Sequence, residues 1–172
     1  MIIMSTFYCG VGIAHFMVPE NFLIIIPPYL PYKLELVYIS GFFEILFGLL
    51  MSIVIFNEFI HFLILRFKKN NFLQFIFLSK KSILKYKYFY SYGLIFLLIA
   101  VFPANYYLYK SEIARESYGF ITQNQAFVRM LFQPLLIITA YWHGNDIENK
   151  KIAILFLCIS IISIIYFVRI LI

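Results

Sequence analysis

Apolar residues fall into five long runs that are separated by segments rich in proline or in charge. The runs are residues 2–18, 36–56, 92–109, 126–142 and 152–172. A helix needs about 17–25 apolar residues to cross the hydrocarbon layer of a bilayer, and each run is close to that length. The pattern therefore predicts an all-α polytopic transmembrane helix bundle, with four core spans and a fifth, C-terminal apolar helix.

The composition argues against a water-soluble domain. Of the 172 residues, 63% are hydrophobic and 13% are charged, whereas soluble domains are about 45–50% apolar and about 25% charged. Lipid is the solvent that accepts the apolar surface this excess implies. We expect residues 1–172 to form a single transmembrane domain in contact with the lipid bilayer. The first run lacks a basic n-region and a cleavage site, so it is interpreted as a retained first helix, whose shortness leaves a start further upstream open.

The connecting segments differ in kind. Segment 19–35 is apolar but contains four prolines, so it predicts a loop or a short helix folded over the membrane surface. Segment 57–91 mixes apolar clusters with basic residues. It fits interfacial helices on an anionic leaflet and, about equally well, a partly disordered basic loop. Segment 110–125 is interpreted as a polar loop.

The placement of lysine and arginine predicts the orientation. With the N-terminus in the cytoplasm, segment 57–91 and Lys150 and Lys151 lie inside, and only Lys33, Lys110 and Arg115 lie outside. This arrangement satisfies the positive-inside rule. The same clustering between apolar runs argues against a nucleic-acid partner, although the net charge is +6.

Polar side chains inside the predicted spans are costly in lipid and therefore each requires an explanation. They are His15, Glu44, Asn105, Arg129 and Gln133. In the N-in topology all of them fall in the outer half of the membrane, with Glu44 and Gln133 deepest at roughly 10–12 Å by helical rise. We expect one shared polar cluster that opens outward beneath the proline-containing segment.

Glycine and proline accompany these polar residues. Gly41 and Gly48 lie on the helix face of Glu44, and Gly12 precedes His15 by about one turn. Small residues at such positions allow a second helix to approach closely. Pro103 cannot donate to the carbonyl of the residue four positions earlier, which predicts a local irregularity near Asn105.

Two interpretations of the polar cluster remain open at this point. In the structural one, Arg129 neutralises Glu44 and the other side chains complete a hydrogen-bonded network that fixes helix register. In the functional one, the cluster binds a small molecule, a proton or a quinone head group. The sequence contains no nucleophile elbow, nucleotide-binding loop or metal-ligand spacing, which disfavours an enzyme and predicts no metal site.

Four sequence blocks, in this order along the chain, resemble the DoxX-like family of membrane proteins. They are 12–16 followed by Pro19 and Pro27, then 40–48, 101–105 and 129–134, and they cover the first four spans. The matching positions are His15, Gly41, Glu44, Pro103, Asn105, Arg129 and Gln133.

The resemblance implies a four-helix bundle in the bacterial cytoplasmic membrane. The family is named after a subunit of a thiosulfate:quinone oxidoreductase, which implies association with a membrane redox complex. Because the polar cluster comes without catalytic motifs, we expect a non-catalytic membrane subunit or small-molecule-binding module in this setting. One alternative is a quinone-linked oxidoreductase component in which Glu44 and His15 exchange protons. Another is a structural or chaperone-like membrane protein. Segment 57–91 and the fifth apolar run depart from the family pattern.

Overall fold

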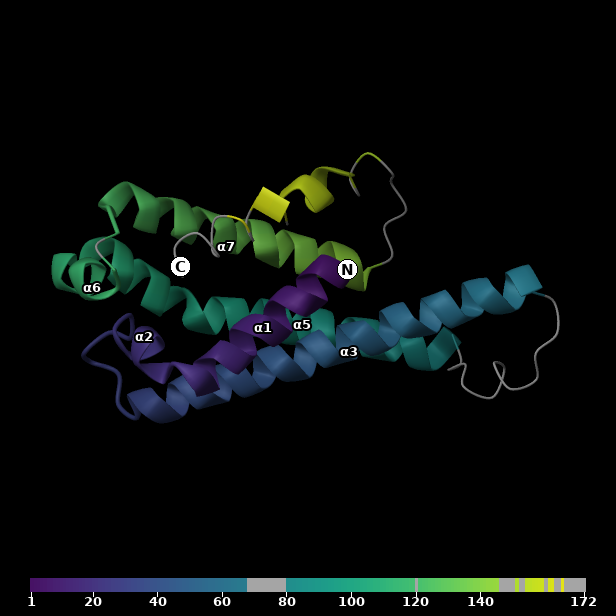
Figure 1. The fold of residues 1–172 in the computed structure, drawn as a ribbon, viewed down its shortest axis with the longest axis horizontal. Helices are drawn as coiled ribbons and strands as arrows, with labels where there is room; N and C mark the ends of the chain where they lie inside the picture. The colour runs from purple at the N-terminus through teal and green to yellow at the C-terminus, as the bar shows by residue number, and fades with distance from the viewer. Residues whose placement is uncertain are drawn as a thin grey trace.

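The computed structural model describes residues 1–67, 80–119 and 121–145, together with 151, 154–159, 161, 162 and 165. Every regular element in these residues is a helix. The four long helices are α1 (Ile2–Met17), α3 (Lys33–Phe67), α5 (Lys80–Lys110) and α7 (Gln123–Gly144), and the two short ones are α2 (Pro19–Leu23) and α6 (Glu112–Ser117). The long helices run alternately in opposite directions, and α2 and α6 lie at the same end of the bundle (Figure 1).

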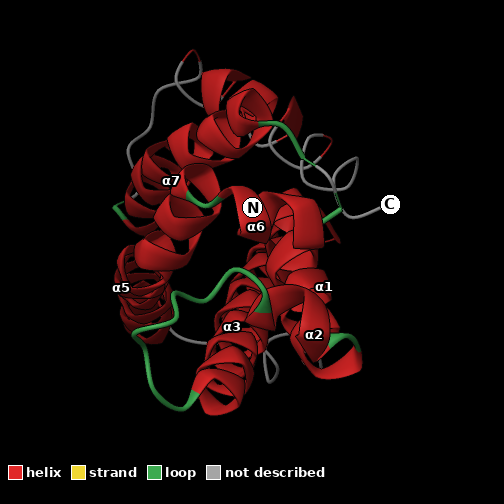
Figure 2. Cartoon of the chain, turned by 90° about the vertical axis from the view of Figure 1, so that its left-hand side faces the viewer, coloured by secondary structure: helices red, strands yellow, loops and turns green. Residues whose placement is uncertain are grey.

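The long helices form two pairs. α1 packs on α3, α5 packs on α7, and contact between α3 and α5 joins the pairs. Viewed towards the end that carries α2 and α6, the pairs occupy opposite sides of the molecule (Figure 2). A buried apolar cluster connects the pairs in the part of the bundle away from α2 and α6; its members include Phe47, Met51, Tyr90, Leu94 and Leu136.

Glycines allow α1 and α3 to lie in direct backbone contact. A Cβ atom on Gly12 would stand 2.7 Å from the carbonyl oxygen of Gly41. One on Gly41 would stand 2.5 Å from the Cβ of His15, and one on Gly48 would stand 2.6 Å from the Sγ of Cys9. The three glycines selected from the sequence for helix packing therefore lie at the closest approach of the two helices.

Two of the described helices are long and apolar enough to cross a membrane. They contain the stretches Lys33–Leu63 and Ser82–Lys110, in which an 18-residue window has a mean hydropathy of 2.3 and 1.5, respectively. The outward surface of the bundle is apolar on all four long helices, where large side chains are exposed; examples are Phe16, Phe42, Phe96, Ile99 and Ile138. These features support association with a membrane.

Segment 57–91 does not form separate interfacial helices or a basic loop where the structure describes it. Residues up to Phe67 continue α3, and residues from Lys80 onward belong to α5. Lys87 is 7% exposed, and its Nζ lies 2.8 Å from a carboxylate oxygen of Glu58. The prediction was wrong here because the basic residues share their helices with apolar side chains that pack inward, such as Val54, Ile60 and Ile83. The central part, residues 68–79, lies outside the described residues.

Two further predictions concern the ends of the spans. Segment 110–125 is not a plain loop, because it contains the short helix α6. Ser111 caps the start of this helix: its hydroxyl accepts a hydrogen bond from the backbone N–H of Ala114. The predicted fifth span, 152–172, lies largely outside the described residues. The residues described there are helical at 154–159, and Ile154, Leu155 and Leu157 are exposed.

Candidate functional site

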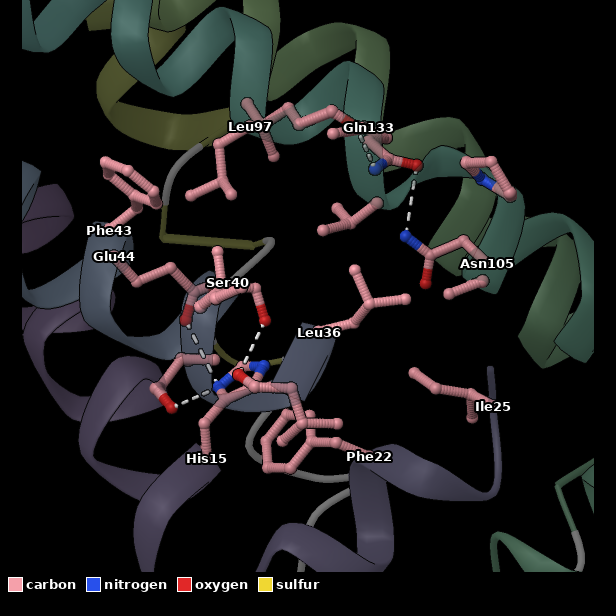
Figure 3. Close-up of a pocket in the computed structure, with 18 of the residues that line it drawn as sticks. His15, Phe22, Ile25, Leu36, Ser40, Phe43, Glu44, Leu97, Asn105 and Gln133 are labelled. Atoms are coloured by element: carbon pink, nitrogen blue, oxygen red, sulfur yellow. Dashed lines mark hydrogen bonds and ion pairs between the residues drawn. The ribbon is translucent and has the colours of Figure 1, made fainter. Parts of the chain in front are cut away.

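A cavity of about 350 Å³ lies between the two helix pairs. It is lined by α1, α3, α5 and α7, with the segment that follows α2 and with Tyr118 after α6. Its volume is within the range of about 300–1,000 Å³ that small-molecule sites occupy. Figure 3 shows apolar side chains such as Phe22, Leu36 and Leu97 around the space, and polar side chains on two opposite walls.

The first polar wall belongs to α1 and α3. The Nδ1 atom of His15 lies 2.8 Å from the carbonyl oxygen of Val11 and 3.3 Å from Oε2 of Glu44. Because a carbonyl oxygen only accepts, Nδ1 carries the proton and donates it to Val11. Its contact with Glu44 is then electrostatic, and no hydrogen bond reaches Oε2 from the described residues. The His15 ring also stacks on Phe22 of α2, with centroids 3.6 Å apart.

The same wall contains a second buried polar atom without a hydrogen bond. The hydroxyl of Tyr8 has no hydrogen-bond partner within the described part of the chain, and Tyr8 is 3% exposed. Both Tyr8 and Glu44 line the cavity. Since α1 meets α3 with Gly12 beside Gly41 and Cys9 beside Gly48, Glu44 lies between the levels of Tyr8 and His15. The wall thus presents two polar atoms, the Tyr8 hydroxyl oxygen and Oε2 of Glu44, that make no hydrogen bond with the residues that the structure describes.

The opposite wall, on α5 and α7, is a connected hydrogen-bond network. Gln133 donates through Nε2 to the carbonyl oxygen of Leu98 (2.7 Å), and its Oε1 accepts from Nδ2 of Asn105 (3.0 Å). Arg129 donates through Nε to Oδ1 of Asn105 (2.9 Å). Both amide groups therefore have partners, and the network ties α5 to α7 at the level of Pro103, which also lines the cavity.

Arg129 continues this network towards α6. Its Nη1 donates to the hydroxyl of Tyr118 (2.6 Å), and its guanidinium lies 5.1 Å from the centre of the Tyr118 ring. Helix α7 begins two turns earlier with a capping box between Thr122 and Gln125, which fixes the start of the helix that carries Arg129. Arg129 is 8% exposed, so its charge is held inside the bundle by these partners.

The five polar residues selected from the sequence all line one cavity, but they do not form one network. They divide into the α1–α3 group and the α5–α7 group. Glu44 has His15 beside it, and Arg129 bonds to Asn105 and Tyr118. The charge of Arg129 nevertheless acts on Glu44, as the structural interpretation expects.

Sequence reasoning missed Tyr8, Tyr118 and Phe22. Tyr8 could have been found, because it lies four residues before Gly12 and seven before His15, on the same helical face. Tyr118 and Phe22 lie in the segments between the long helices, where no periodic pattern indicates which side chain turns inward.

The site shows no metal-ligand cluster in the described residues, and the comparisons with known proteins give one partial family match. Among the residues that the structure describes, no three His, Cys, Asp or Glu side chains come together to hold a metal ion. A family described as a domain of unknown function (DUF8561) matches residues 4–54, which cover most of α1, all of α2 and the first part of α3. No curated protein and no solved structure matches the chain.

Proposed function

We propose that this chain is a DoxX-like integral membrane protein whose cavity binds a small, mostly apolar molecule taken from the lipid phase. The observation that carries the proposal is the cavity of about 350 Å³, which is apolar apart from two polar walls. Sites for small molecules combine these two properties, since apolar lining provides affinity and a few polar groups fix orientation. Binding of this kind needs no catalytic residue, and the role proposed is a non-catalytic subunit or binding module.

The proposal includes four spans, α1, α3, α5 and α7, with a cytoplasmic N-terminus in the bacterial cytoplasmic membrane. Its support is the distribution of charge. Lys85 and Lys87 lie near the start of α5, at the end of the bundle away from α2 and α6 (Figure 1), and the cavity lies towards the other end. On this arrangement the cavity is in the outer half of the membrane, beneath α2 and the segment that follows it.

This topology is testable with single cysteines. We expect a cysteine placed at Glu112 to react with a membrane-impermeant maleimide in intact cells. A cysteine placed at Lys85 should react with the same reagent only after the cells are opened, when the inner face of the membrane becomes accessible. The physical reason is that α5 separates the two positions by most of its length. Background from Cys9 and Cys158 is removed by first replacing both with serine. Labelling of both positions from the same side of the membrane would exclude the four-span arrangement.

Binding in the cavity is testable with a photoactivatable decyl chain in phosphatidylcholine vesicles. We expect adducts on Phe47, which lines the cavity, to exceed those on Leu49, which is 52% exposed on the outer surface. Ser40→Leu should reduce the Phe47 adducts severalfold, because its hydroxyl bonds only to Val37 of its own helix and the added bulk enters the cavity.

The matched control for that variant is Thr6→Leu. The Thr6 hydroxyl also bonds within its own helix, to the carbonyl oxygen of Ile2, but Thr6 does not line the cavity. Adducts on Phe47 should be unchanged in this variant. Equal labelling of Phe47 and Leu49 in the unmodified protein would contradict binding in the cavity and would favour the structural or chaperone-like function.

A second function is favoured by one observation, the 3.3 Å contact between Nδ1 of His15 and Oε2 of Glu44 on the cavity wall. Such a pair could exchange protons with a quinone head group in a quinone-linked oxidoreductase component. The variant Glu44→Gln distinguishes the two functions. If it keeps the cavity labelling but the co-purified redox-complex subunits lose quinone-linked turnover, the oxidoreductase component is favoured. If turnover is unchanged, the non-catalytic binding module is favoured.

A further inference from the structure

We propose that the cavity recognises its ligand through a hydroxyl group that is bound between Tyr8 and Glu44 on the α1–α3 wall. This inference rests on the proposed function, because it specifies the head-group chemistry of a molecule that the cavity binds. It commits to an amphipathic alcohol or phenol: an apolar body in the apolar part of the cavity, and one hydroxyl at this wall.

The α1–α3 wall buries two polar atoms at a cost in free energy. Burying a polar group without a hydrogen bond is unfavourable, and natural proteins leave few such groups. The Tyr8 hydroxyl and Oε2 of Glu44 are both buried without a hydrogen-bond partner among the described residues. Both residues line the same cavity, from adjacent helices in backbone contact. A ligand group placed against this wall can therefore satisfy two protein atoms at once.

A hydroxyl group matches the hydrogen-bonding capacity of Tyr8 and Glu44. The Tyr8 hydroxyl can donate or accept, and a carboxylate accepts whereas a carboxylic acid also donates. A ligand hydroxyl can accept from Tyr8 while it donates to Glu44, and it can accept from Glu44 when that group carries a proton. An ether or ketone oxygen only accepts, so it cannot pair with an ionised carboxylate. A hydroxyl thus matches the wall in either protonation state of Glu44.

The opposite wall is the poorer recognition surface, because its amide groups already bond to protein. Gln133 and Asn105 bond to each other, Gln133 also bonds to Leu98, and Asn105 also bonds to Arg129. Each amide nitrogen carries a second hydrogen, so a ligand can still bond there. Such a bond contributes only modestly, because among the described residues no buried polar side-chain atom of this wall lacks a partner.

Two probes that share one tail test the inference. Each is a decyl chain with a central diazirine; one ends in a hydroxyl and the other in a methyl ether. Both are added to the full chain in phosphatidylcholine vesicles, and adducts on Phe47 are quantified relative to those on Leu49. We expect the alcohol to label Phe47 about fivefold more efficiently than the ether, the ratio that corresponds to one net hydrogen bond.

Tyr8→Phe is the informative variant, since it removes one oxygen atom that lacks a partner and keeps the buried ring. We expect it to fold normally and to reduce the labelling of Phe47 by the alcohol severalfold, because the ligand hydroxyl loses one of its two partners. Tyr92→Phe is the control, because it makes the same chemical change at a residue that is 51% exposed and does not line the cavity. It should keep the full labelling by the alcohol.

The outcomes separate this inference from the proposed function. If both probes label Phe47 equally, in the unmodified protein and in Tyr8→Phe, the hydroxyl inference is wrong and binding in the cavity stands. If neither probe labels Phe47 above Leu49, the cavity does not bind such molecules, and the proposed function fails with the inference. Undiminished labelling of Phe47 by the alcohol in Tyr8→Phe would also overturn the assignment to this wall.

Discussion

Gly12→Ala is expected to lower the free energy of unfolding by about 2–3 kcal/mol, at the upper end of the usual cost of overpacking a core. The new methyl group would stand 2.7 Å from the carbonyl oxygen of Gly41 and 2.9 Å from the backbone nitrogen of Ile45. Neither backbone atom can rotate away, so α1 must move off α3. That displacement would also disturb His15 and the α1–α3 wall of the cavity. Thermal unfolding in mild detergent, followed by the fluorescence of the single tryptophan, Trp142, measures the loss.

Gly10→Ala is the matched control for this substitution. Gly10 lies in the same helix, two residues away, and a Cβ atom there meets nothing within 4 Å. Alanine has the higher helix propensity, so this variant should be unchanged or more stable by up to about 1 kcal/mol. Similar losses from both substitutions would show that helix propensity or detergent effects, and not close packing of α1 on α3, control the stability.

Gln133→Leu is expected to lower the free energy of unfolding by about 1–3 kcal/mol. Gln133 is 3% exposed, and its amide bonds both to Nδ2 of Asn105 and to the carbonyl oxygen of Leu98. Leucine has similar volume but leaves Asn105 without that acceptor inside the bundle. The loss is larger than for one surface hydrogen bond, because no water replaces the missing partner in the interior.

Gln123→Leu makes the same chemical change at the exposed start of α7 and should alter stability by less than about 0.5 kcal/mol. Thermal unfolding of the two variants in one detergent gives the comparison. A Gln133→Leu protein as stable as its Gln123→Leu control would contradict a structural role for the α5–α7 network.

The two cavity walls therefore have different expected roles. The α5–α7 wall is a complete network, and its loss should act on stability. The α1–α3 wall leaves the Tyr8 hydroxyl and Oε2 of Glu44 without hydrogen bonds among the described residues, and its changes should act on binding. The α5–α7 network holds these two helices in place, so ligand binding at the α1–α3 wall would require little rearrangement of the protein.

Much of the fold could be predicted from the sequence. The excess of apolar residues indicates helices in lipid, because only helices satisfy their own backbone hydrogen bonds there. Four of the predicted apolar runs coincide with α1, α3, α5 and α7, although α3 and α5 extend well beyond them. The basic residues of segment 57–91 predict a connection between helices and not the ends of α3 and α5. In the structure, Lys87 of α5 is buried beside Glu58 of α3, so a charged residue there belongs to the packed helices.

The candidate site could be predicted as a set of residues but not as an arrangement. Helical rise placed His15, Glu44, Asn105, Arg129 and Gln133 at matching depth, and all of them line one cavity. Depth along a helix is a local property, fixed by residue number. The neighbours of each side chain depend on rotation about the helix axis and on which helices pack together, which no local pattern specifies. Only the tertiary structure therefore decided that Glu44 lies beside His15, that Arg129 lies beside Asn105 and Tyr118, and that Tyr8 belongs to the site.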